Sequence, residues 1–327
     1  MSDPALVADA IRARHSFILT SHARPDGDAV GSCLSLAFAL DRIGKQVRVV
    51  LRDPVPEPYR VFPGIDRIVI AERMDEPADA VVFLECSDRE RPGVAGLNGR
   101  FAINVDHHLG NTMYGDVNWF DASACACGEM VADIIDALGV AWTTDIASHL
   151  YLAIATDTGS FRFGPVTART FDACRRIVDA GVDTSALARQ IFDSFSIGRV
   201  KLTGAMLAAM TLHHDNRLAV LAFDDDLLRQ CGATVDDTEG LVNLPLAARE
   251  VTAVVLIKRQ DATTYRLSLR SKGDVDVRAV AAQWQGGGHK NAAGCTIVGE
   301  IAELKDAIVD AMTRAIDVVS PAAAARS

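Results

Sequence analysis

The sequence predicts an α/β fold in which a parallel sheet forms the core of the N-terminal half of the chain. Apolar, β-rich runs alternate there with helical patterns, which is typical of a parallel sheet flanked by helices. After a mainly helical stretch the pattern changes to successive strands and a closing helix, which predicts a second, smaller α/β domain. The 327 residues are enough for each domain to bury its own core.

Short apolar runs mark the candidate strands of the N-terminal half, at 17–20, 47–51, 80–84 and 101–105. Between the first two, apolar residues from Val30 to Ile43 recur at a helical spacing, and Gly44 follows as a stop signal. Comparable patterns predict further helices at 128–138, 145–155 and 168–180. This alternation of strand and helix supports the parallel sheet.

The stretch 183–212 is expected to form a helical connection between the domains. We place the boundary near residue 195, so that 1–195 forms the first domain and 196–319 the second. Strands are expected at 218–223, 251–259 and 265–270, and a helix at 300–318. The small residues of 320–327 predict a frayed tail.

Composition narrows the class of protein. Hydrophobic residues make up 49% of the chain, which excludes a disordered protein, and no apolar run approaches the ~18 residues of a membrane helix. The first twenty residues lack the features of a secretion signal, so we expect a cytoplasmic protein without a membrane partner. The seven cysteines are irregularly spaced, which argues against a disulfide framework and favours buried thiols.

The net charge of −10 argues against binding to long nucleic acid, which relies on a basic surface. It does not exclude a nucleotide as substrate, because a bound metal ion can dominate the local field among carboxylates. We therefore expect any nucleic-acid partner to be short.

Histidines and carboxylates gather directly after three of the predicted strands and at the end of one helix. They are His22, Asp26, Asp28, Glu85, Asp88, Asp106, His107, His108 and Asp157. Because the carboxyl ends of parallel strands lie at one edge of a sheet, we expect these side chains to converge on one crevice. Taken singly, each of these residues could have a purely structural role; Asp28, for example, could cap the helix that follows. Their joint placement favours a functional site.

This set of side chains predicts a metal centre. Imidazole and carboxylate ligands without a thiolate favour Mn²⁺ or a related octahedral ion over structural Zn²⁺. The number of ligands is enough for two ions about 3.5–4 Å apart, which would activate water for an in-line displacement at phosphorus. By contrast, His213 and His214 are expected late in a helical pattern without nearby acidic residues, and we assign them no role.

The spacing of His22, Asp26 and Asp28, the triplet from Asp106 to His108, and Asp157 resemble motifs of the DHH phosphoesterase superfamily. The chain looks most like the group of nanoRNases and 3′-phosphoadenosine-5′-phosphate phosphatases, and the resemblance covers nearly the whole chain. One motif departs from the family pattern. The family normally has an aspartate after the third strand, where this chain has Glu85, with Asp88 as the alternative.

The resemblance implies roles for the clustered residues. One metal would be held by His22 and Asp26, the other by Asp28, His107 and Asp157, and Glu85 would bridge the two. His108 would lie beside the scissile phosphate as the catalytic residue. Asp106 would orient a neighbouring histidine.

Two segments of the second half resemble the substrate-binding signatures of the DHH-associated domain: 269–271 and the glycine-rich run 286–294. The substrate-binding residues implied are Arg270, Ser271, Gly287, Gly288 and His289. Glycines let a phosphate approach backbone N–H groups, and a guanidinium can bind it through two parallel hydrogen bonds. The active site would lie in the cleft between the two domains.

The function implied is that of a two-manganese phosphoesterase acting on short oligoribonucleotides and 3′-phosphoadenosine-5′-phosphate, with a homodimer as the expected assembly. A cyclic or linear dinucleotide phosphodiesterase would share every motif. An inorganic pyrophosphatase would share the metal half only. A nucleotide-binding sensor without activity is a fourth interpretation, prompted by Glu85 in place of aspartate.

Overall fold

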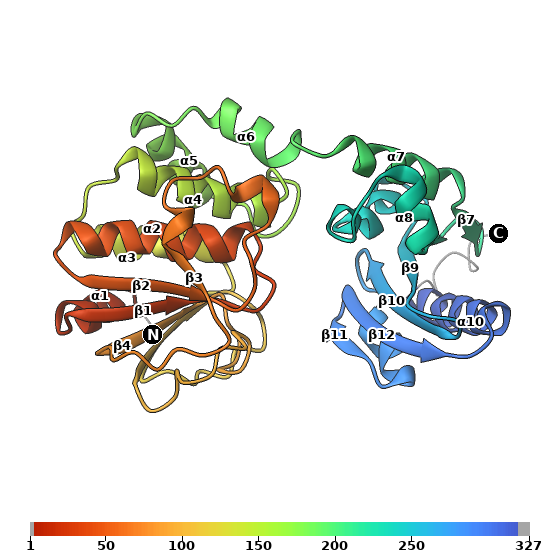
Figure 1. Cartoon of the computed structure of the whole chain (residues 1–327), viewed down its shortest axis with the longest axis horizontal. Helices are drawn as coiled ribbons and strands as arrows, with labels where there is room; N and C mark the ends of the chain where they lie inside the picture. The colour runs from red at the N-terminus through yellow and green to blue at the C-terminus, as the bar shows by residue number, and fades with distance from the viewer. Residues whose placement is uncertain (1–2, 320–327) are drawn as a thin grey trace. The chain divides into compact units, whose positions relative to one another are not determined.

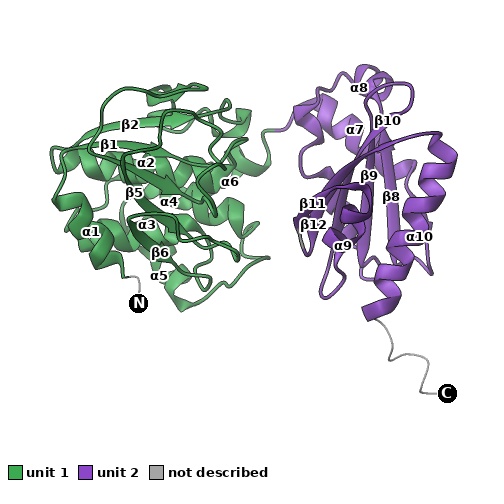
Figure 2. Cartoon of the chain, turned by 90° about the horizontal axis from the view of Figure 1, so that it is seen from below, with its two compact units in different colours: residues 1–194 green, residues 195–327 purple. Residues whose placement is uncertain are grey.

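The computed structural model describes residues 3–319 (Figure 1). The chain forms two compact units, of which one ends at Ser194 and the other begins at Phe195 (Figure 2). Each unit contains a six-stranded sheet. The predicted α/β class, with a parallel sheet in the first half, is confirmed. The predicted frayed tail, 320–327, lies outside the described residues.

The sheet of the first unit is parallel throughout, and its strand order is β3-β2-β1-β4-β5-β6. Its strands are β1 (Ser16–Thr20), β2 (Gln46–Leu51), β3 (Ile68–Ile70), β4 (Ala80–Leu84), β5 (Phe101–Asp106) and β6 (Val117–Phe120). The order reverses between β1 and β4, and in such sheets the carboxyl ends at the reversal point open a crevice for ligands.

Helices cover one face of this sheet (Figure 1). The helices next to the sheet are α1 (Pro4–Arg12), α2 (Gly27–Arg42) and α3 (Cys127–Ala137), and α4 (Thr144–Asp157) packs against α2 and α3. Helices α5 (Ala168–Asp179) and α6 (Thr184–Phe192) pack against α4 on its outer side (Figure 1), and η1 (Glu57–Tyr59) and η2 (Ile65–Arg67) are short 3₁₀ turns. Phe17 and Leu19 of β1 belong to the core on the helical face. Ile18 points to the opposite face, where it packs with Phe83 and Leu97 in a smaller core.

Close packing of α2 against α4 places the start of one helix beside the end of the other. A side chain at Gly27 would meet the hydroxyl of Thr156 at 2.4 Å, and one at Gly31 would meet the carbonyl oxygen of His149 at 2.4 Å. Only glycine allows two helices to approach this closely at these positions. As a result the acidic start of α2 lies near Asp157, the last residue of α4.

The second unit has a mixed sheet of order β11-β12-β10-β9-β8-β7, in which only the β8–β9 pair is parallel. Its strands are β7 (Thr211–His213), β8 (Leu218–Phe223), β9 (Ala253–Arg259), β10 (Thr264–Ser271), β11 (Gly287–His289) and β12 (Ala292–Val298). Its helices are α7 (Ile197–Ala208), α8 (Asp225–Cys231), α9 (Val277–Ala281) and α10 (Ile301–Val319), with 3₁₀ segments η3 (Asp236–Thr238), η4 (Leu241–Ala247) and η5 (Ala282–Trp284). Helices α9 and α10 pack on one face of the sheet, and α7 and α8 on the other.

The predicted helical connection over 183–212 is wrong at its C-terminal end. Helices α6 and α7 are separate, and 211–213 forms the strand β7, which pairs with β8. His213 therefore lies in a strand, and the ring of His214 pairs with Asp317 at 2.7 Å. Sheet hydrogen bonds to a distant segment outweigh the local helical pattern there. The expectation that all cysteines are buried is also wrong for Cys174 and Cys231, which are partly exposed.

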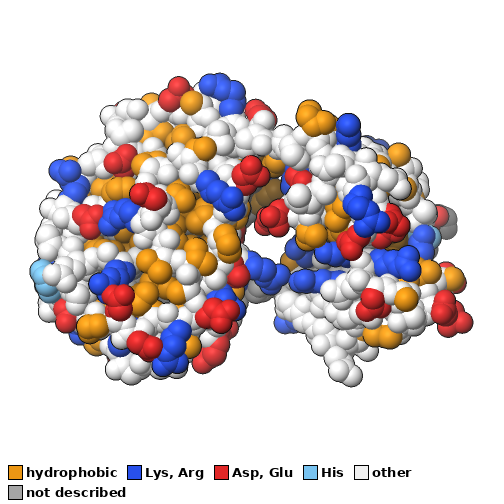
Figure 3. All heavy atoms as spheres, viewed as in Figure 1, with side chains coloured by type: hydrophobic (Ala, Val, Ile, Leu, Met, Phe, Trp, Pro, Cys, Tyr) orange, Lys and Arg blue, Asp and Glu red, His pale blue; other side chains and the backbone are white. Residues whose placement is uncertain are grey.

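On the face of the molecule drawn in Figure 3, acidic and basic side chains are mixed, without a continuous basic stripe on the first unit. Within the described part of the chain, no helix combines the length and the apolar character that crossing a membrane requires.

Candidate metal centre

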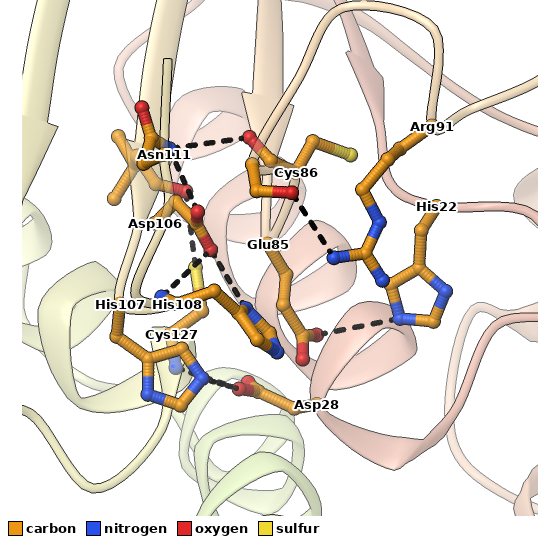
Figure 4. A network of polar contacts seen from close by, with 12 residues as sticks. His22, Asp28, Glu85, Cys86, Arg91, Asp106, His107, His108, Asn111 and Cys127 are labelled. Carbon is orange, nitrogen blue, oxygen red and sulfur yellow. Dashed lines mark hydrogen bonds and ion pairs between the residues drawn. The ribbon is translucent and has the colours of Figure 1, made fainter. Parts of the chain in front are cut away.

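The predicted site segments leave the carboxyl ends of adjacent strands (Figure 4). His22 follows β1, Glu85 follows β4, and His107 and His108 follow β5. Because these three strands are neighbours in the sheet, the side chains lie at one edge, at the point where the strand order reverses. The fourth segment arrives with α4, which ends at Asp157.

All three histidines of the cluster are held through the same ring nitrogen, Nδ1. Nδ1 of His22 lies 2.9 Å from the carbonyl oxygen of Ala23, and Nδ1 of His107 lies 3.1 Å from the carbonyl oxygen of Ala124. Nδ1 of His108 lies 2.9 Å from Oδ1 of Asp106. These oxygens can only accept, so Nδ1 carries the proton and the neutral ring keeps its lone pair on Nε2. The hydrogen bonds therefore prepare Nε2 of each ring to bind a metal or to accept a proton.

The two aspartates at the start of α2 are fixed by backbone N–H groups. Asp26 caps its own helix: Oδ1 accepts from the N–H of Ala29 at 3.0 Å, while Oδ2 lies 3.7 Å from Nε2 of His22. Asp28 is fully buried and accepts from the N–H groups of Cys127 (2.6 Å) and Gly128 (2.9 Å) at the start of α3. A helix N-terminus favours a negative charge, which offsets part of the cost of burying this carboxylate.

Two groups of potential ligands share one carboxylate. The first group is His22, Asp26 and Glu85, and the second is Asp28, Glu85, His107 and Asp157. Within each group the ligand atoms lie within 4.8 Å of one another. The same criterion also joins Glu85 with His107 and His108. Glu85 is thus placed where a carboxylate could contact two ions.

The distances in the cluster fit ligands around a cation better than direct hydrogen bonds. Nε2 of His107 lies 3.6 Å from Oδ2 of Asp157 and 3.9 Å from Oδ2 of Asp28, and Nε2 of His22 lies 3.9 Å from Oε2 of Glu85. Two ligands of one octahedral ion, each about 2.1 Å from it, lie about 3 to 4 Å apart. Oε2 of Glu85 and Nε2 of His107 are buried, and neither has a hydrogen-bond partner among residues 3–319.

The pKa values of the carboxylates in the cluster also favour a bound cation. Burial, followed by the like charges of Asp26 and Asp28, raises the pKa of Glu85 well above its usual value. Burial and the charge of Asp28 raise the pKa of Asp157 to about 7. Burial and mutual repulsion therefore oppose the charged forms of these carboxylates, and a divalent ion would remove the repulsion. The residues present fit a metal ion.

Asp88 takes no part in these groups. Its Oδ1 accepts the N–H groups of Glu90 at 3.1 Å and Arg91 at 2.9 Å, so it closes the turn in which it stands. Glu85, by contrast, is only 1% exposed and faces the other residues of these groups. Its backbone is left-handed, with a φ of 58°, which is uncommon for a residue other than glycine and is found often at functional sites.

The signature residues of the second unit lie at the ends of its central strands. Arg270 and Ser271 end β10, and Gly287 and Gly288 form β11, which pairs with β12. The hydroxyl of Ser271 donates to the carbonyl oxygen of Val275 at 2.7 Å and accepts from the amide of Asn291 at 2.8 Å. The backbone of His289 belongs to β11, but its side chain lies outside what the structure describes.

A model of the DHH family N-terminal domain matches residues 16–154, and a DHHA1 domain model matches 215–317. A bifunctional oligoribonuclease and PAP phosphatase NrnA of Thermus thermophilus is 33% identical over 90% of this chain and 88% of its own length. The chain belongs to the DHH family. The resemblance read from the sequence is therefore confirmed.

Two further proteins show the likeness over most of the chain. A bifunctional oligoribonuclease and PAP phosphatase NrnA of Bacillus subtilis is 26% identical over 86% of this chain and 89% of its own. The crystal structure of an exopolyphosphatase-related protein from Bacteroides fragilis superposes with a TM-score of 0.90, at 25% identity and with 97% of each chain covered. The expectation that this DHH protein is a hydrolase acting on phosphate esters is confirmed.

Several residues that shape the site were missed by reasoning from the sequence. Asn111 holds the second oxygen of Asp106 at 2.7 Å, and the N–H groups of Cys127 and Gly128 hold Asp28 from a hundred residues away. Arg91 lies beside His22 in Figure 4, although no motif drew attention to it. An arginine six residues after the Glu85 motif is the one signal that the sequence offers.

Proposed function

We propose that this DHH protein uses two manganese ions to hydrolyse phosphate esters in short oligoribonucleotides and in 3′-phosphoadenosine-5′-phosphate. The observation that carries the proposal is the pair of ligand groups that share Glu85. The relatives named oligoribonuclease and PAP phosphatase support the choice of substrate, since the likeness to them covers most of both chains.

The first ion would be held by His22 and Asp26, and the second by Asp28, His107 and Asp157, with Glu85 between them. Mixed imidazole and carboxylate ligands without a thiolate support manganese. When bound, the two ions would activate a water molecule and stabilise negative charge on the reacting phosphate.

His108 is the residue that we propose to act on the substrate directly. Its backbone N–H and its Nδ1 both contact Oδ1 of Asp106, at 3.3 and 2.9 Å, and Asn111 fixes the other oxygen of that carboxylate. Hydrogen bonds to His108 and Asn111 outweigh the effect of burial and hold the pKa of Asp106 below its usual value, so it remains a charged acceptor. A ring held in this way can exchange a proton with a phosphate oxygen through Nε2.

The second unit would bind the terminal phosphate of the substrate through Arg270, Ser271, Gly287, Gly288 and His289. A Cβ atom at Gly287 would meet no heavy atom of the described residues within 4 Å, so its backbone is open to a ligand. A pocket for a terminal phosphate would restrict cleavage to substrates of a few nucleotides. We place the reaction in the cytoplasm, where thiols stay reduced, because all seven cysteines are free.

A length series tests the proposal. RNAs of two to five nucleotides and a 24-nucleotide RNA of mixed sequence are incubated with the protein and Mn²⁺, and mononucleotide release is followed by chromatography. Rapid release from the short RNAs alone is expected. Equal rates on the long RNA would refute the restriction to short substrates, and turnover of cyclic dinucleotides alone would replace the proposed substrate.

A further inference from the structure

Arg91 lies on the loop that follows Glu85, at the edge of the metal centre (Figure 4). Its carbonyl oxygen accepts a 2.8 Å hydrogen bond from the N–H of Ala23, the residue after His22. Figure 4 shows its guanidinium beside the imidazole of His22. The guanidinium therefore lies next to a proposed metal ligand.

Asp88 holds Arg91 in this place. One oxygen of its carboxylate accepts both the N–H of Glu90 and the N–H of Arg91. The turn closes with a 3.0 Å bond from the N–H of Gly93, which has a φ of 64°, to the carbonyl oxygen of Glu90. The loop is thus ordered by its own hydrogen bonds, and Asp88 is the residue that positions Arg91.

Among the described residues 3–319, no carboxylate forms an ion pair with the guanidinium of Arg91. Its one hydrogen bond within the described residues is a long contact of 3.4 Å from Nη1 to the hydroxyl of Ser87. Arg169, in the same unit, shows the usual alternative: it binds Asp121 at 2.9 Å and Asp133 at 2.7 Å. Since a guanidinium has five N–H donors, most of those of Arg91 remain open to a ligand.

We infer that Arg91 binds the reacting phosphate through two parallel N–H···O bonds. This inference rests on the proposed function. It adds to the metal ions a side chain of the protein that binds the substrate's phosphate directly. The carboxylates of the cluster repel an incoming phosphate. An arginine without a carboxylate partner lowers that repulsion, and its planar fork matches two phosphate oxygens.

A competing explanation is that Arg91 only offsets the negative charge of the carboxylates. The substitution Arg91→Lys separates the two, because lysine keeps the charge and loses the fork. Arg91→Met removes both and serves as a second variant. Arg89→Lys is the matched control, since Arg89 stands on the same loop but its guanidinium lies over the rings of Phe83 and Tyr114, 5.8 Å from each centroid.

The experiment measures the affinity of each protein for Mn²⁺ and of its Mn²⁺-loaded form for inorganic phosphate, both by calorimetry, and the KM for 3′-phosphoadenosine-5′-phosphate. For Arg91→Lys we expect phosphate affinity to fall and KM to rise about tenfold or more, with Mn²⁺ affinity unchanged. Arg91→Met should lose at least as much phosphate affinity, and Arg89→Lys should match the wild type.

Wild-type phosphate affinity in Arg91→Lys would overturn the inference, and so would a loss confined to Mn²⁺ affinity. The wild-type protein could bind phosphate in a way that depends on Arg91 and yet turn over no nucleotide. That result would support the inference and refute the proposed function. The two failures are therefore distinguishable.

Discussion

Nδ1 of His108 lies 2.9 Å from Oδ1 of Asp106, and the other oxygen of this buried carboxylate accepts from Asn111 at 2.7 Å. The carboxylate thus sets both the orientation and the tautomer of the ring that we propose to act on the substrate. A residue two positions before His108 in the chain performs this task because β5 ends at Asp106 and the chain turns there.

Asp106→Asn should lower kcat by about 10- to 100-fold with little change in KM. An asparagine has only one acceptor oxygen and no charge, so it cannot accept hydrogen bonds from both His108 and Asn111. The imidazole of His108 then loses its fixed tautomer. Steady-state kinetics on 3′-phosphoadenosine-5′-phosphate measure the effect. Asp9→Asn, at an exposed position of α1, is the control. Unchanged kcat in Asp106→Asn would remove His108 from the reaction.

Glu85→Gln should weaken metal binding and at the same time stabilise the metal-free protein. Metal binding weakens because a neutral amide cannot bridge two cations. The metal-free protein gains stability because burial and like charges disfavour a carboxylate at this position but not an amide. Metal analysis should give about two Mn²⁺ per wild-type chain and fewer in the variant. The Tm of the metal-free variant should be higher by several degrees at pH 7.5.

Asp88→Asn decides between the two candidates for the bridging ligand. An asparagine oxygen can still accept the N–H groups of Glu90 and Arg91, so Mn²⁺ content should stay at the wild-type value. Asp88→Ala loses this acceptor and should weaken phosphate binding without loss of metal. If Asp88→Asn lost Mn²⁺ while Glu85→Gln retained it, the assignment of Glu85 would be wrong.

The stability of the metal-free protein should fall as pH rises from about 5 to 8. The pKa of Asp157 is about 7 in the folded chain against a usual value of 3.8, so over this range the folded state holds a proton that the unfolded chain has released. Stability is therefore present at low pH and is lost as pH rises through the folded pKa. The pKa values of Asp28, Glu85 and His107 are raised as well, which gives the same sign.

Thermal unfolding in the presence of a chelator at pH 5.5 and pH 8 measures this effect, with an expected fall in Tm of about 3–10 °C. Saturating Mn²⁺ should remove the fall or reverse it, because the cation replaces the proton. A Tm that rises with pH in the metal-free protein would contradict the account of the cluster.

Gly287→Ala should raise the KM for short nucleotides without loss of stability. A Cβ atom at Gly287 meets no atom of the described residues within 4 Å, so we expect a methyl group there to obstruct only a ligand. At Gly286 a Cβ atom would lie 2.3 Å from the carbonyl oxygen of Gly294, so Gly286→Ala should lower the Tm. Unchanged KM in Gly287→Ala would place phosphate binding elsewhere.

The parts of the fold that could be predicted are those with a complete local signal. Helix α2 has a full apolar period and ends before Gly44, whose φ is 73°, and the candidate strand 80–84 coincides with β4. The edge strands β3 and β6 were not predicted, because three and four residues are too few to show a strand pattern. Strand β11 consists of two glycines and a histidine, and it is a strand only because β12 pairs with it.

The candidate site shows the same division. The clustering of the candidate ligands could be predicted from their positions after strands, because sheet topology brings strand ends together. The tautomers of the histidines could not, since they depend on carbonyl groups such as that of Ala124, 17 residues from His107. The role of Asp88 was also out of reach, because a carboxylate that closes a turn and one that binds a metal look alike in sequence.

The most direct test of the central claim is phosphate release from 3′-phosphoadenosine-5′-phosphate, and mononucleotide release from a diadenylate, by protein freed of metal and then supplied with Mn²⁺. Asp157→Ala is measured in parallel, with circular dichroism to show that it is folded. The account predicts turnover of both substrates that requires Mn²⁺ and is lost in Asp157→Ala. Equal rates with and without Mn²⁺, or full activity of the variant, would contradict it.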